Sequence, residues 1–420
     1  MFWDAISAFE GNLAALREFV DVVHPFLESR WQSSVKSHGW ELMPLRMLLE
    51  KLAPDFELNE TVDEELIRSK FKGEISFSET GDESEKKGVS MSVSGEDADA
   101  FMAAAIEVIH GLRYEQLLYE SALISLVSVA EVFTSDIIRT YLDEYPDVVG
   151  TREPFFSLDE LRKFSSIDEV KEQWLEAKVT SILHGSVDDW ISFLKTHAKL
   201  SMSYLEDDMP RLLEVFERRN VLIHNSGNVN RLYLSKVHPK LTENVARGER
   251  LFVDHEYMAT AMSLVELNIM LVCAELWKKL RPDDAQRGDK LNDIVFNSLM
   301  NNRWHVAEGI SRFVMQDNRM SESTRLIGQF NFWLSIKCQG RYETIKTDVE
   351  DADFSAKDTI FQLALHAITG REKEFIALLP KVLRSKVLSL NQLDTWPIFR
   401  EMRDTPRYTK IRNRYERKKS

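Results

Sequence analysis

The sequence predicts a mainly α-helical protein with more than one domain, and three observations support this. Apolar residues recur three and four positions apart over most of the chain, which is the period of a half-buried helix. The hydrophobic fraction of 44% and the charged fraction of 29% are ordinary for a globular protein. A chain of 420 residues is longer than one hydrophobic core usually serves. We therefore expect an N-terminal helical region over residues 1–100, a helical bundle over residues 101–283 and a helical-repeat domain over residues 284–420.

The N-terminal region is predicted to be helical first and irregular afterwards. Apolar spacing indicates two helices within residues 1–55. The stretch FSETGDESEKKGVSMSVSGEDADA, residues 77–100, is rich in serine, glycine and acidic residues, which is typical of a loop or linker. A short hairpin fits here, with strands around KGEISFS and GVSMSVS. We expect a domain boundary near residue 100.

Five helices are predicted in the central bundle, over residues 103–145, 167–183, 187–198, 209–224 and 254–279. The fourth has the clearest boundaries. Asp207 or Asp208 is placed to cap its first amide groups, and Pro210 suits its first turn. Gly227 follows shortly after its end, where a helix commonly reverses direction. This region is therefore expected to be a bundle of packed helices.

The C-terminal region shows weak internal similarity. Three segments, FNSLMNNRWHVAEGI, LSIKCQGRYETIKT and LALHAITGREKEFIALL, each end an apolar helix at Asn or Gly, then have an arginine and begin a new helix. These arginines, Arg303, Arg341 and Arg371, are 38 and 30 residues apart, which brackets the 34-residue tetratricopeptide repeat. We expect a tetratricopeptide-like array. Three unrelated helical hairpins are the alternative.

Composition and charge limit the classes of function. The net charge of −14 argues against a surface that coats nucleic acid, so any RNA contact must be local. Cys273 and Cys338 lie in apolar contexts and are expected to be buried free thiols, which fits a reducing cytoplasm. The longest uncharged apolar run, residues 121–130, is too short to span a bilayer. We expect a cytoplasmic protein with no signal peptide and no membrane segment.

One stretch near the end of the 209–224 helix departs from its apolar pattern. Residues 218–224 read RRNVLIH, and the chain lacks the glycine-rich phosphate loops, zinc motifs and nucleophile elbows of common enzymes. Helical spacing puts Asn220 and His224 one turn apart, and the long side chain of Arg219 can curl towards the same face. Burying such a polar group without a partner costs about 1–3 kcal/mol, so a local conflict of this kind indicates a functional site.

These three residues suit metal-free cleavage of RNA. An imidazole can remove a proton from a ribose 2′-hydroxyl, which then attacks the adjacent phosphorus. The Arg219 guanidinium can neutralise charge on the phosphate oxygens, and Asn220 can orient the imidazole or a phosphate oxygen. A second group must protonate the leaving 5′-oxygen, and the motif holds only His224. A two-fold dimer would supply the second histidine, so the site is expected to be shared.

The segment FERRNVLIHNSGNVNRLYL, with the preceding helix YESALISLVSVAEVFTSDIIRTYLDEYP and the following GERLFVDHEYMATAM, resembles a HEPN domain. This superfamily of helical bundles carries an R-x(4–6)-H motif, often with a polar residue after the arginine. The resemblance covers residues 101–283. It implies that Arg219 and His224 are the catalytic pair and that Asn220 is the accessory polar residue.

The resemblance also implies a biological setting. Members commonly act as dimeric, metal-independent endoribonucleases in antiphage abortive infection or in toxin–antitoxin systems. We therefore expect RNA as substrate, such as tRNA or mRNA, no cofactor, and a homodimer with a composite active site. The flanking helical regions are expected to bind a protein, a phage-derived trigger or an antitoxin that restrains the activity.

Two other functions remain open. The first is a non-enzymatic dimeric scaffold whose repeats bind a protein partner. The second is a nucleotide-binding face that does not cleave. Aromatic residues at helix ends, such as Trp396, fit either core packing or a peptide groove. The basic terminus RYTKIRNRYERKKS, residues 407–420, is expected to be a solvated end or to contact RNA or a partner.

Overall fold

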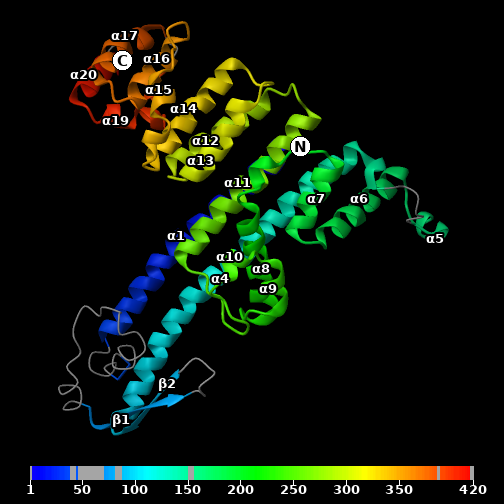
Figure 1. Ribbon diagram of the computed structural model, residues 1–420, viewed down its shortest axis with the longest axis vertical. Coiled ribbons are helices and arrows are strands. Elements are labelled where there is room, and N and C mark those ends of the chain that lie inside the picture. Colours follow the sequence, from blue (N-terminus) through cyan, green and yellow to red (C-terminus); the bar gives the residue numbers. More distant parts are fainter. Residues whose placement is uncertain are drawn as a thin grey trace. The chain divides into compact units, whose positions relative to one another are not determined.

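The computed structural model describes residues 2–37, 44–45, 71–80, 88–149, 156–385 and 388–416. These residues are mainly helical, as predicted, and include one two-stranded antiparallel sheet (Figure 1). The chain forms two compact units. The first contains Met1–Leu13, Leu126–Arg250 and Ala259–Ser420, and the second contains Ala14–Ser125 and Leu251–Met258.

Three long helices contribute residues to both units: α1 (Phe2–Ser37), α4 (Ala98–Glu144) and α11 (His255–Leu280). Each unit is therefore assembled from segments that are distant in the sequence. The division into three consecutive regions stays a prediction. The second helix predicted within residues 1–55 lies outside the described residues, apart from residues 44–45.

The second unit contains the predicted hairpin, formed by β1 (Gly73–Thr80) and β2 (Gly88–Gly95). Its register pairs Ile75 with Val93 and Phe77 with Met91, so alternation along each strand gathers apolar side chains on one face. Part of this face packs against a small core cluster near the start of α4, formed by Phe71, Phe101 and Ala105. The hairpin is thus stabilised by burial of one face, as a two-stranded sheet requires.

The first unit contains the helices predicted for the bundle. They are the second half of α4, α6 (Ile167–Leu183), α7 (Val187–His197), α8 (Met209–Asn225) and most of α11. Ser186 accepts a hydrogen bond from the Asp189 amide while the Asp189 side chain accepts from the Ser186 amide, and this capping box begins α7. Phe9 of α1 stacks on Phe133 of α4 with ring centroids 4.3 Å apart.

The C-terminal part of the first unit is a series of short helices. They are α12 (Gln286–Met300), α13 (Trp304–Gln316), α14 (Glu322–Cys338), α15 (Lys346–Glu350), α16 (Thr359–Ile368), α17 (Glu372–Ser385), α18 (Leu390–Thr395), α19 (Arg400–Arg403) and α20 (Pro406–Glu416). Helix α12 pairs with α13, α13 with α14, and α16 with α17. The region is helical, as predicted, and its assignment to the tetratricopeptide repeat stays a prediction.

The three similar segments of this region share one backbone geometry. Asn302, Gly340 and Gly370 all have positive φ, at 58°, 73° and 69°. The arginine that follows each of them donates its amide hydrogen to a carbonyl five residues earlier, at 2.8–3.1 Å. This is the bond of a left-handed helix C-cap, so the recurring Asn or Gly before an arginine marks a repeated helix end.

A buried ion pair joins α11 to the C-terminal helices. The Arg287 guanidinium of α12 donates to Asp317 at 3.0 Å and to the carbonyl oxygens of Arg281 and Pro282. Lys278 of α11 lies 3.1 Å from the same carboxylate. Arg287 and Asp317 are both about 1% exposed, so the charges are compensated where water does not reach. The bundle and the C-terminal helices therefore belong to one packed unit.

The cysteines and the most apolar helices bear on two further expectations. Both cysteines are free, as expected, but only Cys273 is buried. Cys338 is exposed, because it ends α14 on the solvent side, so the expectation that it is buried is wrong. Among the described residues, α4 and α11 are long and apolar enough to cross a membrane. The most apolar window of α11 is 78% buried, as core helices often are, so this is weak evidence for a membrane.

Candidate active site

Helix α8 carries the three predicted site residues, and its observed span differs from the prediction by one residue. Pro210 lies in its first turn, as expected. The predicted cap by Asp207 or Asp208 is wrong, because Asp208 is the N-cap residue and its carboxylate accepts no helix amide; it instead accepts a hydrogen bond from Asn268 of α11 at 2.9 Å. Asn268 is buried, so its side-chain amide needs this acceptor. The Nε2 atom of His305 in α13 lies 3.9 Å from the same carboxylate. The start of α8 is thus held by tertiary contacts.

The end of α8 is set by backbone geometry. Ser226 adopts the left-handed conformation with φ of 51°, and its amide donates to the Val221 carbonyl. Gly227 also has positive φ, at 82°, and donates to the same carbonyl at 3.1 Å. The glycine after the helix was expected, and it is the residue type that adopts this conformation without strain. This reversal leaves His224 in the last turn of the helix.

The inner face of α8 packs into the bundle core. Phe216 meets Trp190 of α7 edge to face, with ring centroids 5.6 Å apart and planes at 81°. The other buried apolar residues on this helix are Leu212, Val215, Val221 and Leu222. Burial of these side chains, worth about 1.5–3 kcal/mol each, fixes the rotation of α8 about its axis. The directions in which the polar residues leave the helix are fixed with it.

Arg218, the other arginine of the motif, belongs to a structural network. Its Nε donates to the Glu214 carboxylate at 2.7 Å, and the Tyr233 hydroxyl donates to the same carboxylate at 2.7 Å. Glu214 and Tyr233 are both buried. This network ties α8 to α9 (Arg231–Lys236), with a second link from Lys236 to Glu217 at 2.7 Å. Arg218 therefore has a packing role that distinguishes it from Arg219.

Arg219 points from α8 towards α4. Its guanidinium forms an ion pair with the Glu131 carboxylate through Nη2. The Arg219 side chain is 15% exposed, and its Nε is buried without a hydrogen-bond partner among the described residues. Burial lowers the pKa of this guanidinium. The ion pair thus fixes a half-buried cation that keeps an unused donor.

Asn220 and His224 lie on the neighbouring stripe of α8. Asn220 is half-buried and His224 is exposed. In the part of the chain that the structure describes, neither side chain forms a hydrogen bond or ion pair, and none joins them to Arg219. Arg219 and His224 are five residues apart, which is roughly 140° around a helix axis. One chain therefore offers a fixed cation and an exposed imidazole that leave α8 in directions roughly 140° apart, rather than a closed triad.

Glu131 is the residue of this site that the sequence analysis missed. It follows directly after the uncharged run of residues 121–130, and the only signal was a single carboxylate within the apolar stretch of residues 121–135. Glu131 and Arg219 are 88 positions apart, so no local spacing rule links them. A charged residue on an apolar helix needs a partner, and two such residues on different helices of one bundle are candidates to meet.

Neither a metal site nor a known relative adds to this geometry. Over residues 2–37, 44–45, 71–80, 88–149, 156–385 and 388–416, no group of three or more His, Cys, Asp or Glu side chains is arranged to hold a metal ion. Comparison of the chain with protein-family models, with curated proteins and with solved structures gives no match. Arg219, Asn220 and His224 of α8 and Glu131 of α4 are therefore the residues that indicate a function.

Proposed function

We propose that the chain is a metal-independent endoribonuclease of the HEPN type in which Arg219 and His224 are the catalytic pair and Asn220 is an accessory polar group. The observation that carries the proposal is the half-buried Arg219 guanidinium, which is fixed by Glu131 five residues before an exposed histidine on the same helix. A cation held in a partly dry site stabilises developing negative charge without reorganising at the moment of reaction. An exposed imidazole can reach a ribose hydroxyl.

The proposed reaction transfers a phosphoryl group within one RNA strand, from the 5′-oxygen of one nucleotide to the 2′-oxygen of the nucleotide before it. His224 takes the proton of a 2′-hydroxyl, and the 2′-oxygen attacks the adjacent phosphorus. The bond from phosphorus to the 5′-oxygen breaks, and that oxygen leaves with a proton from an acid. The products are a 2′,3′-cyclic phosphate and a 5′-hydroxyl. Arg219 neutralises the charge on the non-bridging oxygens, and Asn220 orients one of them.

A second copy of the chain completes the proposed site, because one protomer offers a single histidine. Exposed apolar side chains lie next to the site residues in the sequence: Val132 follows Glu131, and Ile223 precedes His224. Leu232 of α9 is also exposed. Large exposed apolar residues around polar groups are typical of a surface that another protein covers. We infer a homodimer in which two copies of His224 serve as base and acid.

The cellular role follows from the family resemblance. We propose a cytoplasmic toxin or abortive-infection effector of antiphage defence whose RNA substrate, tRNA or mRNA, is cut when a trigger binds or an antitoxin leaves. The alternative is a non-enzymatic dimeric scaffold that binds a protein partner through its C-terminal helices. A binding face for a nucleotide that is not cleaved is the third candidate.

One experiment separates these candidates. Purified protein is incubated with RNA in EDTA, and the new ends are identified chemically. We expect 2′,3′-cyclic phosphate ends, and a loss of rate of about 10²–10⁴ in His224→Ala and about 10²–10³ in Arg219→Ala. RNA that stays whole with the wild type favours the scaffold. Nucleotide binding that Arg219→Ala abolishes, without cleavage, favours the third candidate.

A further inference from the structure

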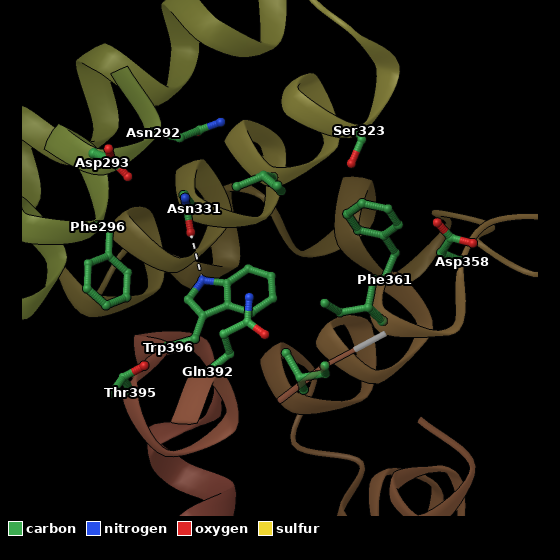
Figure 2. Close-up of a pocket in the computed structure, with 13 residues that line it drawn as sticks. Asn292, Asp293, Phe296, Ser323, Asn331, Asp358, Phe361, Gln392, Thr395 and Trp396 are labelled. Carbon is green, nitrogen blue, oxygen red and sulfur yellow. Dashed lines mark hydrogen bonds between the residues drawn. The ribbon is translucent and has the colours of Figure 1, made fainter. Parts of the chain in front are cut away.

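A cavity of about 510 Å³ lies among the C-terminal helices of the first unit, on elements separate from α8. Its walls come from α12, α14, α16 and α18 (Figure 2). Its volume is within the ~300–1,000 Å³ range of ligand-binding clefts. Three aromatic side chains line it, and Phe296 and Phe361 lie on either side of the Trp396 indole (Figure 2). The cavity can therefore bury an apolar side chain of a ligand.

The Trp396 indole is held in place before any ligand arrives. Its Nε1 donates to the Asn331 side-chain oxygen at 3.2 Å, and Asn331 is only 2% exposed (Figure 2). Phe399 packs edge to face on the same indole, with ring centroids 5.2 Å apart and planes at 82°. A fixed aromatic surface loses little side-chain entropy when it is covered. The indole thus forms a preformed apolar contact for a ligand.

A buried acceptor in the wall lacks a partner. Asn292 of α12 donates through Nδ2 to the Thr324 carbonyl at 3.4 Å. Its Oδ1 is buried and accepts no hydrogen bond from the residues that the structure describes. An unsatisfied buried acceptor costs about 1–3 kcal/mol. Because this oxygen is closed to solvent, it is a feature of the wall and not a contact for the ligand.

The charge of the cavity is negative. Asp293 and Asp358 lie on opposite sides of it, and no lysine, arginine or histidine is among its lining residues (Figure 2). Both carboxylates are exposed, and neither side chain forms an ion pair or hydrogen bond within the described ranges of the chain. Two unpaired carboxylates repel a phosphate-bearing strand and attract a cationic ligand. The cavity is therefore unsuited to RNA and differs in chemistry from the Arg219 site.

The chain's own basic terminus is a poor occupant, because α20 is held by specific contacts to the other C-terminal helices. In α20, the Tyr415 hydroxyl donates to the Pro380 carbonyl at 2.9 Å. Arg412 forms an ion pair with Asp394 at 3.0 Å. Residues 406–416 would have to leave these contacts to reach another site. A segment of a separate protein is therefore favoured as the ligand.

We propose that this cavity binds an extended segment of a partner protein that carries an apolar side chain flanked by lysine or arginine. The apolar side chain lies against Trp396. The cationic groups pair with Asp293 and Asp358. This binding site goes beyond the ribonuclease function and does not depend on it.

The test uses the full-length protein and a displayed library of random nine-residue peptides. Enriched sequences are synthesised with a fluorescent label, and their Kd is measured by anisotropy. We expect enriched peptides to carry Lys or Arg beside an aliphatic or aromatic residue. Their affinity should fall as ionic strength rises, because salt screens the charge pairs.

Two matched double variants locate the site. Asp293→Asn with Asp358→Asn should weaken binding roughly tenfold and reduce the salt dependence. Asp348→Asn with Asp351→Asn makes the same change in net charge at exposed residues outside the cavity, and should bind like the wild type. All four residues are exposed, so both variants should fold.

Several results would overturn the proposal: no enriched sequence, enriched peptides without basic residues, or equal binding by the two double variants. RNA cleavage by the cavity variant in the absence of peptide should match the wild type. The peptide measurement and the RNA measurement can therefore fail independently.

Discussion

The ion pair between Glu131 and Arg219 separates a catalytic role of the arginine from a structural one. Glu131→Gln keeps the shape of the side chain and removes its charge. The side chain of Glu131 is 36% exposed and that of Arg219 is 15% exposed, so the pair is intermediate between exposed and buried ion pairs. Exposed pairs contribute about 0.2–1 kcal/mol, and breaking a buried pair costs about 3–5 kcal/mol. Because the carboxylate is more than a third exposed, we expect a loss of about 1 kcal/mol in the free energy of unfolding.

The expected effect on cleavage is larger than this loss of stability. Arg219 keeps its charge in the variant, but the guanidinium is no longer fixed. A misplacement of about 1 Å in a catalytic group can cost about 10²-fold in rate. We expect Glu131→Gln to cleave roughly 10- to 100-fold more slowly than the wild type, with Arg219→Ala slower still.

Asp143→Asn provides the matched control. Asp143 lies on the same helix and forms an ion pair with Lys171 at 2.5 Å, away from α8. The control variant should lose a similar or smaller free energy of unfolding and cleave at the wild-type rate. Stability is measured by urea denaturation, and rates by cleavage of a fluorescent RNA. Should Glu131→Gln lose stability but cleave like the control, the fixed guanidinium has only a packing role and the reasoning is refuted.

Three further predictions concern α8 and the cysteines. Ser226→Gly should raise the free energy of unfolding by about 0.5–1 kcal/mol in urea denaturation, because Ser226 has a left-handed backbone; a decrease would contradict this. Burial raises the pKa of both thiols, but Cys338 is exposed and Cys273 is buried, so one thiol per native chain should react with a thiol reagent and Cys273 should react only on unfolding. His305 lowers the pKa of Asp208 below its usual 3.8, so this group adds stability above that pH and loses it as the pH falls through the lower folded value. Asp208→Asn should therefore be less stable than the wild type at pH 7, and the difference should shrink below about pH 4 in unfolding measurements.

The helices of the bundle could be predicted because their signals are local. A period of 3.6 residues places one apolar face on each helix, and Pro210 and Gly227 mark the ends of α8. The hairpin could be predicted for the same reason, since alternation identifies its strands. In the C-terminal region, the recurring Asn or Gly before Arg303, Arg341 and Arg371 is a local signal for a helix end. The signal recurs because each of these helices ends at a residue with positive φ, which Asn and Gly adopt most readily.

The features that could not be predicted depend on contacts between distant residues. Asp208 is well placed in the sequence to cap α8, but the buried Asn268 amide, 60 residues later, competes for its carboxylate. Glu131 becomes part of the site only because α4 packs beside α8. The cavity requires four helices whose relative positions no spacing rule supplies. A pattern in the sequence identifies which side chains need a partner. The packing of the helices determines which residue that partner is.

The contacts at the start of α8 limit how the cavity could influence the proposed active site. A ligand in the cavity contacts α12 and α14, whereas α13 holds α8 through His305 and Asp208. The peptide can change cleavage through the contact between His305 and Asp208 only if that contact has two arrangements and the peptide binds them with different affinities. Linkage then requires RNA to change the affinity for the peptide by the same factor as the peptide changes the affinity for RNA. Measuring both factors in wild type and in His305→Ala distinguishes coupling through this contact from two independent sites, because only coupling through His305 is lost in the variant.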